Sequence, residues 1–202
     1  METTWIARAM VAMAASATLA GCVVFPIHVY VADAAGGTPV YERCSLNPHV
    51  PVGVMVERPG LHATVSLVQQ YDGGFVAVQC DLPKRQTMVL RETTIVIDAR
   101  DGKAPLGATI PYVNPVGPAG YPEPLAVLKR VIPVDAEMKG GRLPMGDASS
   151  DRHYWVAGRF DGHLADEVWV TLPAFTLNGV PQELPAIHFD KRFMIARGLF
   201  NC

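Results

Sequence analysis

The sequence lacks the short motifs that bind nucleotides and redox cofactors. It contains no glycine-rich phosphate loop, no dinucleotide-binding fingerprint and no paired Cys-x-x-Cys. It also lacks the Gly-x-Ser-x-Gly turn that presents the nucleophilic serine in many hydrolases. We therefore expect no cofactor, and the hypothesis of a serine hydrolase loses support without being excluded.

The chain has no excess of basic residues. Its 17 Lys and Arg are balanced by 19 Asp and Glu, for a formal net charge of −2. The dibasic pairs are scattered along the chain and do not form one basic run. Because proteins that bind nucleic acid carry a concentrated positive surface, we expect no nucleic-acid partner.

The apolar stretch at the N-terminus, residues 9–19, is too short to span a bilayer as a helix. It follows Arg8, the only basic residue before it, and small residues come after it. A short apolar run with a basic start and small residues at its end is typical of a cleaved secretory signal. The first residues are therefore predicted to be a signal peptide, not a membrane span.

The run Leu19-Ala20-Gly21-Cys22 resembles the lipobox of bacterial lipoprotein precursors. The resemblance implies that residues 1–21 are removed and that Cys22 is lipidated at its thiol and its new amino group. Each acyl methylene buried in a bilayer contributes about 0.8 kcal/mol, so several chains would anchor the protein permanently. Membrane lipid, held through Cys22, is thus the first expected partner.

Val23 occupies the place where an Asp retains lipoproteins at the inner membrane. The resemblance therefore implies an outer-membrane anchor that faces the periplasm. An ordinary secretory signal cleaved near Ala17 or Leu19 is the alternative.

The chain divides into three parts on this interpretation. Residues 1–21 are the signal, 22–37 the lipidated N-terminus and its tether, and 38–202 a single domain. Residues 23–31 could form either a first strand or part of the extended tether.

Three cysteines remain besides Cys22, in a compartment where disulfides persist. Cys80 alternates with Val76, Val78 and Leu82, so we expect a buried thiol. A disulfide between Cys44 and Cys202 is preferred because it would pin the C-terminus; Cys44 with Cys80 is the alternative.

The fold is predicted to be all-β. Short runs rich in Val, Ile and Thr alternate with turn residues, and no long segment has a helical period. Tyr71-Asp72-Gly73-Gly74 and Asn178-Gly179 are the hairpin signals. The expected strands are 52–56, 61–70, 75–82, 88–99, 153–160, 167–172, 174–177 and 187–195.

We expect these strands to form an antiparallel β-sandwich, immunoglobulin-like or related, with a β-barrel as the second choice. Residues 105–145 contain so many Pro and Gly that they are predicted to be a long irregular insertion.

One cluster of imidazoles and carboxylates points to metal or acid–base chemistry. If the strands at 153–160 and 167–172 formed a hairpin, their polar ends would converge. The candidate metal ligands are His153, Asp161 and His163. The cluster also includes Asp151, Asp166 and Glu167. Exposed loops are also rich in Asp, Gly and His, because these residues favour turns, and we favour that interpretation.

His188 and Asp190 lie on the same side of another expected strand, where the carboxylate could orient the imidazole. We favour the interpretation that this side of the strand simply faces solvent.

Exposed aromatic residues would suit a sugar-binding face, since aromatic rings stack on sugars. The candidates are Tyr121, Tyr154, Trp155 and Trp169, although alternation favours core packing for them.

The sequence thus favours a lipid-anchored envelope protein that acts as a non-catalytic structural or protein-interaction module, with another envelope protein as its partner. The alternatives are an envelope hydrolase or metal-dependent enzyme using His153, Asp161 and His163, and a glycan-binding module.

Overall fold

The computed structural model describes residues 24–33, 37–41, 50–111, 113–116, 135–139 and 152–197. The lipobox, Cys44 and Cys202 lie outside these residues. Among the described residues there are fifteen strands and no helix. These residues therefore contain no helix long and apolar enough to cross a membrane. The prediction of an all-β fold is confirmed.

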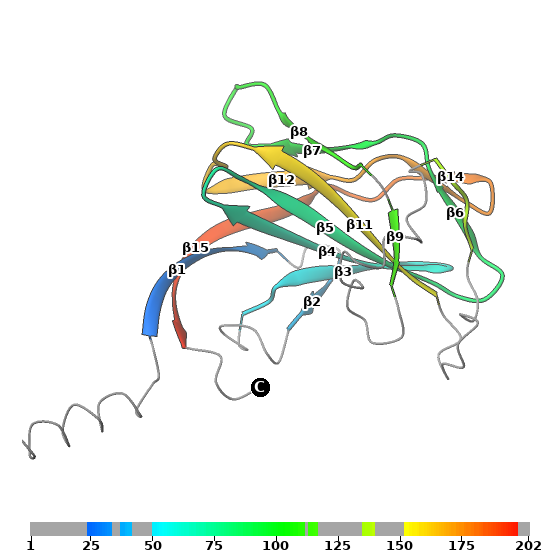
Figure 1. The fold of residues 1–202 in the computed structure, drawn as a ribbon, viewed down its shortest axis with the longest axis horizontal. Coiled ribbons are helices and arrows are strands. Elements are labelled where there is room, and N and C mark those ends of the chain that lie inside the picture. Colours follow the sequence, from blue (N-terminus) through cyan, green and yellow to red (C-terminus); the bar gives the residue numbers. More distant parts are fainter. Residues whose placement is uncertain are drawn as a thin grey trace, which may run out of the picture.

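The strands alternate with short turns along the whole described chain (Figure 1). They are β1 (Val24–Ala32), β2 (Thr38–Val40), β3 (Gly53–Arg58), β4 (Leu61–Gln70), β5 (Gly73–Leu82), β6 (Thr87–Leu90), β7 (Thr94–Asp98), β8 (Leu106–Thr109), β9 (Val113–Val116), β10 (Met138–Lys139), β11 (Arg152–Asp161), β12 (Glu167–Thr171), β13 (Phe175–Leu177), β14 (Val180–Gln182) and β15 (Ile187–Arg197).

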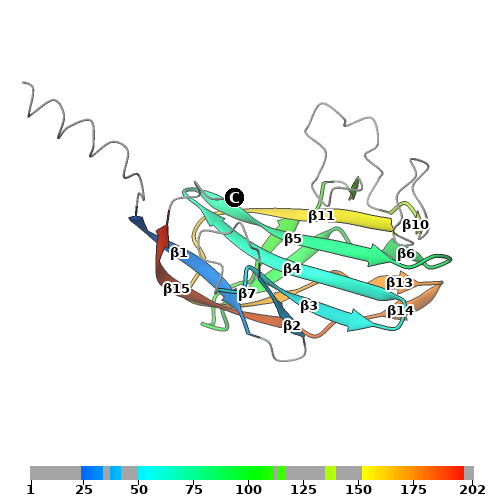
Figure 2. The same cartoon turned by 90° about the horizontal axis from the view of Figure 1, so that it is seen from below.

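All strand pairs are antiparallel and form two sheets. The large sheet has the order β1-β15-β12-β7-β8-β11-β5-β4-β3-β2, with β9 added to β11, and the small sheet has the order β10-β6-β13-β14. The large sheet curls until β1 lies beside β3 and β4 (Figure 2). A two-layered sandwich and a nearly closed barrel therefore both describe the fold.

The core lies inside the curl, and strand alternation builds it. Leu61, Ala63, Val65 and Leu67 of β4 are buried, while the residues between them are partly exposed. Both predicted hairpin turns are present: Gln70 pairs with Gly73, and Leu177 pairs with Val180. Asn178 and Gly179 have φ of 52° and 81°, the left-handed values that a tight hairpin turn requires.

Of the two alternatives for residues 23–31, the strand is the one observed. β1 pairs with β15 along its whole length, from Val24↔Arg197 to Ala32↔Phe189. Tyr30, Val31 and Ala32 are buried. Assigning 22–37 to a tether was therefore wrong for 24–32, because these residues bury apolar surface in the domain.

The expected strand 88–99 is two strands in two sheets. β6 belongs to the small sheet and β7 to the large one. Exposed Arg91 and Glu92 interrupt the apolar alternation between them, and the amide of Arg91 donates to the carbonyl of Ala174. The chain crosses from one sheet to the other at this charged break.

The expected irregular insertion, 105–145, contains β8, β9 and β10. Ala108, Ile110, Val113 and Met138 from this segment are all buried in the core. Pro115 lies within β9, which pairs only with β11 among the described strands. The lost amide donor of Pro115 does not prevent β9 from pairing with β11, so proline content alone overestimated the irregular part.

Candidate functional site

The outer surface of four neighbouring strands carries the main polar cluster. In β3, β4, β5 and β11, the residues Glu57, His62, Asp81 and His153 stand opposite one another in register. A second row two residues along contains Gln79 and Trp155, which also pair directly. We name these six residues, Glu57, His62, Gln79, Asp81, His153 and Trp155, the histidine face.

Asp81 and His153 make the tightest contact of the histidine face. The Nδ1 of His153 lies 2.6 Å from the Oδ1 of Asp81, and the two side chains are 24% and 26% exposed. The amide of Gln79 donates to the same Oδ1 at 3.3 Å. A carboxylate accepts hydrogen bonds and does not donate them, so the hydrogen-bonded tautomer has its proton on Nδ1. The contact also orients the imidazole ring, with Nε2 facing away from Asp81.

Such an oriented imidazole can act as a proton acceptor at Nε2. Catalysis would also require a nucleophile or a bound water beside that nitrogen. Within the described part of the chain, no hydrogen bond joins Nε2 of His153 to another residue. The pair alone therefore gives a polar recognition point and does not define a reaction.

His62 and Glu57 form the weaker half of the row. Their Nδ1 and Oε1 atoms are 3.5 Å apart, and both side chains are more exposed than those of the Asp81–His153 pair. Solvent screens such a contact, so it contributes little to stability. The pair extends the row of hydrogen-bonding side chains across four strands, from β3 to β11.

Trp155 is half-buried and lies on the outer surface beside this row, because it alternates with the buried residues Tyr154 and Val156 along β11. Its register partner in β5 is Gln79. Core packing, the favoured interpretation for the aromatic candidates, holds for Tyr154 and is wrong for Trp155. The phenol of Tyr154 is buried and donates to the carbonyl of Lys139 at 3.0 Å. Tyr121 lies outside the described residues.

The hairpin on which the metal-site hypothesis depended, between residues 153–160 and 167–172, does not form. β11 pairs with β5, β8 and β9, whereas β12 pairs with β7 and β15. His153 and Asp161 consequently stand at opposite ends of β11, roughly 27 Å apart at about 3.4 Å per residue. His163 is exposed in the loop after Asp161. The three candidate ligands do not share a site.

The other members of that cluster also have separate neighbours. Asp166 pairs with Lys191 at 3.2 Å, and Glu167 lies 4.0 Å from His188. Asp151 lies outside the described residues. Over the ranges that the structure describes, no three His, Cys, Asp or Glu side chains are grouped closely enough to hold a metal ion.

A second aromatic cluster lies on the outer surface of β12 and β15, beside the turn that follows β7. The rings of Trp169 and His188 stack with centroids 4.6 Å apart, and the guanidinium of Arg100 lies 4.2 Å from the Trp169 centroid. Trp169 is half-buried, so core packing is wrong for it as well. These contacts occupy ring surface that a sugar would need, which leaves Trp155 as the better stacking candidate.

Asp190 does not orient His188, although the two share one side of β15. Asp190 pairs with Arg192 at 3.0 Å, and the nearest carboxylate oxygens to His188 belong to Asp33 and Glu167. Ile187 and Phe189 are buried, as the alternation predicted.

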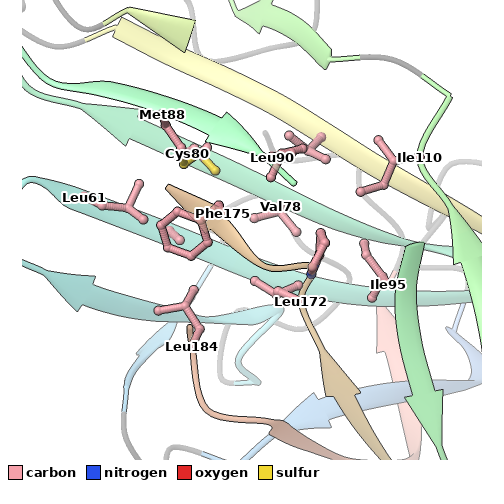
Figure 3. A pocket seen from close by; sticks show the side chains of 13 residues that line it. Leu61, Val78, Cys80, Met88, Leu90, Ile95, Ile110, Leu172, Phe175 and Leu184 are labelled. Atoms are coloured by element: carbon pink, nitrogen blue, oxygen red, sulfur yellow. The ribbon is translucent and has the colours of Figure 1, made fainter. Parts of the chain in front are cut away.

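The interior offers a cavity of only about 30 Å³, at the junction of the two sheets. Its walls are apolar, and Figure 3 shows Cys80, Met88 and Phe175 among the lining side chains. Cys80, the one cysteine that the described ranges contain, is buried with a free thiol. Burial, aided by the charge of Asp81, raises the pKa of this thiol to about 12. The cavity has room for a water-sized group and not for a larger ligand.

Glu57, His62, Gln79 and Asp81 were missed as candidate residues because they belong to three different strands. One signal could have found part of the row. Once Tyr71-Asp72 is the turn between β4 and β5, the pairing Gln70↔Gly73 places His62 opposite Asp81.

Comparisons with protein-family models, with curated proteins and with solved structures find no match to this chain.

Proposed function

We propose that this chain is a lipid-anchored cell-envelope protein, a non-catalytic structural or protein-interaction module on the periplasmic side of the outer membrane. One observation supports the proposal beyond the lipobox itself. β1 begins at Val24, two residues after Cys22, and pairs with β15 over its full length. An acylated Cys22 would thus connect the membrane directly to a strand of the domain.

The histidine face and the adjacent strand β9 form the proposed partner surface. β9 pairs only with β11 among the described strands, and we propose that a strand of the partner protein pairs along its other side. Trp155 lies on β11, opposite Asn114 of β9, on the side where these two strands pair. Half-buried Trp residues surrounded by hydrogen-bonding groups are frequent centres of protein interfaces.

The anchor is tested by intact mass and fractionation of the full chain expressed in a bacterium with two membranes. The expected result is loss of residues 1–21, a mass gain matching acyl chains on Cys22, and recovery in the outer-membrane fraction. The Cys22→Ser variant is the matched control and should be recovered without acyl mass. An unacylated wild-type chain would contradict the proposed anchor.

The partner surface is tested by placing a photo-crosslinking amino acid at Trp155 in the anchored protein. Val96, an exposed residue on β7, is the control position. A discrete protein adduct from position 155 that is absent from position 96 supports the proposal. Equal labelling of the two positions contradicts it.

Glycan binding is the second candidate, because the half-buried ring of Trp155 stands in register with Gln79 and so combines an aromatic surface with an amide group. Trp155→Ala should then weaken retention on peptidoglycan, whereas Trp169→Ala should not. Equal retention of both variants and the parent would exclude this candidate.

A further inference from the structure

The paired strands β1 and β15 extend beyond the rest of the sheet at the end where β1 begins and β15 finishes. Figures 1 and 2 both show this two-stranded ribbon projecting from the body of the domain. The side of β15 that carries Ile187 and Phe189 is buried in the core. Four residues after Phe189 on the same side, Phe193 is 63% exposed, because the ribbon has passed the edge of the core.

Phe193 has one aromatic neighbour in the ribbon. It is the register partner of His28 in β1, and the two rings meet edge to face with centroids 5.5 Å apart. His28 is itself exposed. The pair forms a small amphipathic spot on a surface that no other described strand covers.

The ribbon end is also the part of the domain nearest to Cys22. Two residues of chain reach at most about 7 Å, so Cys22 lies within that distance of Val24. Along β1, the four steps from Val24 to His28 span about 14 Å. With about 5 Å more between paired strands, Phe193 lies within roughly 26 Å of Cys22, a reach comparable with the ~20 Å of one bilayer leaflet and its headgroups.

We propose that the end of the β1–β15 ribbon rests on the phospholipid surface, with Phe193 at the boundary between headgroups and acyl chains. The proposal rests on the lipid anchor at Cys22. Aromatic rings are favoured at that boundary because they combine an apolar body with a tolerance for polar surroundings. One ring cannot hold a domain on a membrane, so the acyl chains supply the attachment and Phe193 sets the orientation.

The two basic side chains that the structure describes in the ribbon do not call for anionic lipid. Lys191 and Arg192 precede Phe193, but Lys191 pairs with Asp166 at 3.2 Å and Arg192 with Asp190 at 3.0 Å. Their charge is therefore balanced within the protein. Zwitterionic phosphatidylcholine is the appropriate probe membrane.

The test uses the lipidated full chain in phosphatidylcholine vesicles, with the photo-crosslinking residue p-benzoylphenylalanine in place of Phe193. The control places the same residue at Val180, an apolar residue of similar exposure at 56%, on β14 at the other end of the molecule (Figure 1). Thermal unfolding and the intact mass establish that each variant is folded and acylated.

A phospholipid adduct at position 193, several times more abundant than at position 180, is the expected result. Equal or absent adducts at position 193, in protein whose Cys22 is acylated, would overturn the membrane-facing ribbon and leave the anchor intact. A protein with unmodified Cys22 would overturn the anchor and this inference together.

Discussion

Asp81 and His153 stand opposite each other on β5 and β11, with Oδ1 and Nδ1 2.6 Å apart. Because both side chains are largely shielded, we expect a coupling free energy of about 1 kcal/mol between them. A double-mutant cycle with Asp81→Ala and His153→Ala, measured by urea unfolding, gives this value. The matched cycle with Glu57→Ala and His62→Ala should give about 0.3 kcal/mol or less, since that contact is longer and exposed. Equal couplings in the two cycles would show that shielding does not strengthen the first pair.

Cys80 is expected to be inert in the folded protein. Burial raises the pKa of its thiol from 9.0 to about 12, so little thiolate is present at pH 8 and reagents cannot reach it. In a Cys44→Ser/Cys202→Ser variant, alkylation should be negligible without denaturant and complete in urea. Rapid alkylation of the folded variant would contradict the burial of Cys80.

The same thiol links stability to alkaline pH. The folded-state pKa is raised, so the folded state holds the proton more tightly, and its contribution is present below pH 9 and is lost as the pH rises toward 12. The free energy of unfolding should fall more steeply for the parent than for Cys80→Ala in this window, by up to about 1.4 kcal/mol per pH unit. Parallel curves would mean that the thiol does not contribute.

Tyr30 connects β1 to the loop between β11 and β12 through a hydrogen bond. Its hydroxyl donates to the carbonyl of Ala165 at 2.7 Å, and the ring is buried. Tyr30→Phe should lower the free energy of unfolding by about 1 kcal/mol. Hydrogen exchange should accelerate first in β1. The control variant Tyr41→Phe, at an exposed tyrosine, should leave both measurements unchanged.

The interior cavity gives opposite predictions for two substitutions in its wall. Val78→Ile adds one methylene toward a space of about 30 Å³ and should stabilise the protein by about 0.5 kcal/mol. Phe175→Ala enlarges the same space and should cost about 3 to 5 kcal/mol. Urea unfolding measures both. A destabilised Val78→Ile would indicate that the cavity wall cannot accept the added group.

Local patterns predicted the parts of the fold that local interactions determine. The turns at Tyr71-Asp72 and Asn178-Gly179 follow from residues that accept tight-turn geometry, and the burial of Leu61 and its alternating neighbours follows from strand periodicity. Sheet order was not predictable in this way. Nothing near Val24 in the sequence indicates that its partner is Arg197.

The candidate site shows the same division. His153 was identified from the sequence as a candidate, but with Asp161 and His163, which are close to it only along the chain. Its actual partner is Asp81, because β11 lies beside β5 and not beside β12. A contact between distant strands depends on the topology of the whole sheet, which a single sequence does not contain in any local pattern.

The pairing of β1 with β15 also has a consequence for the order of folding. The first of the described strands has the last of them as its main partner, so β1 cannot pair until β15 is present. Contacts so distant along the chain form slowly, because a long loop must close before any pairing is gained. We therefore expect the pairing of β1 with β15 to be a late step of folding, so that a chain truncated before Ile187 would remain sensitive to protease.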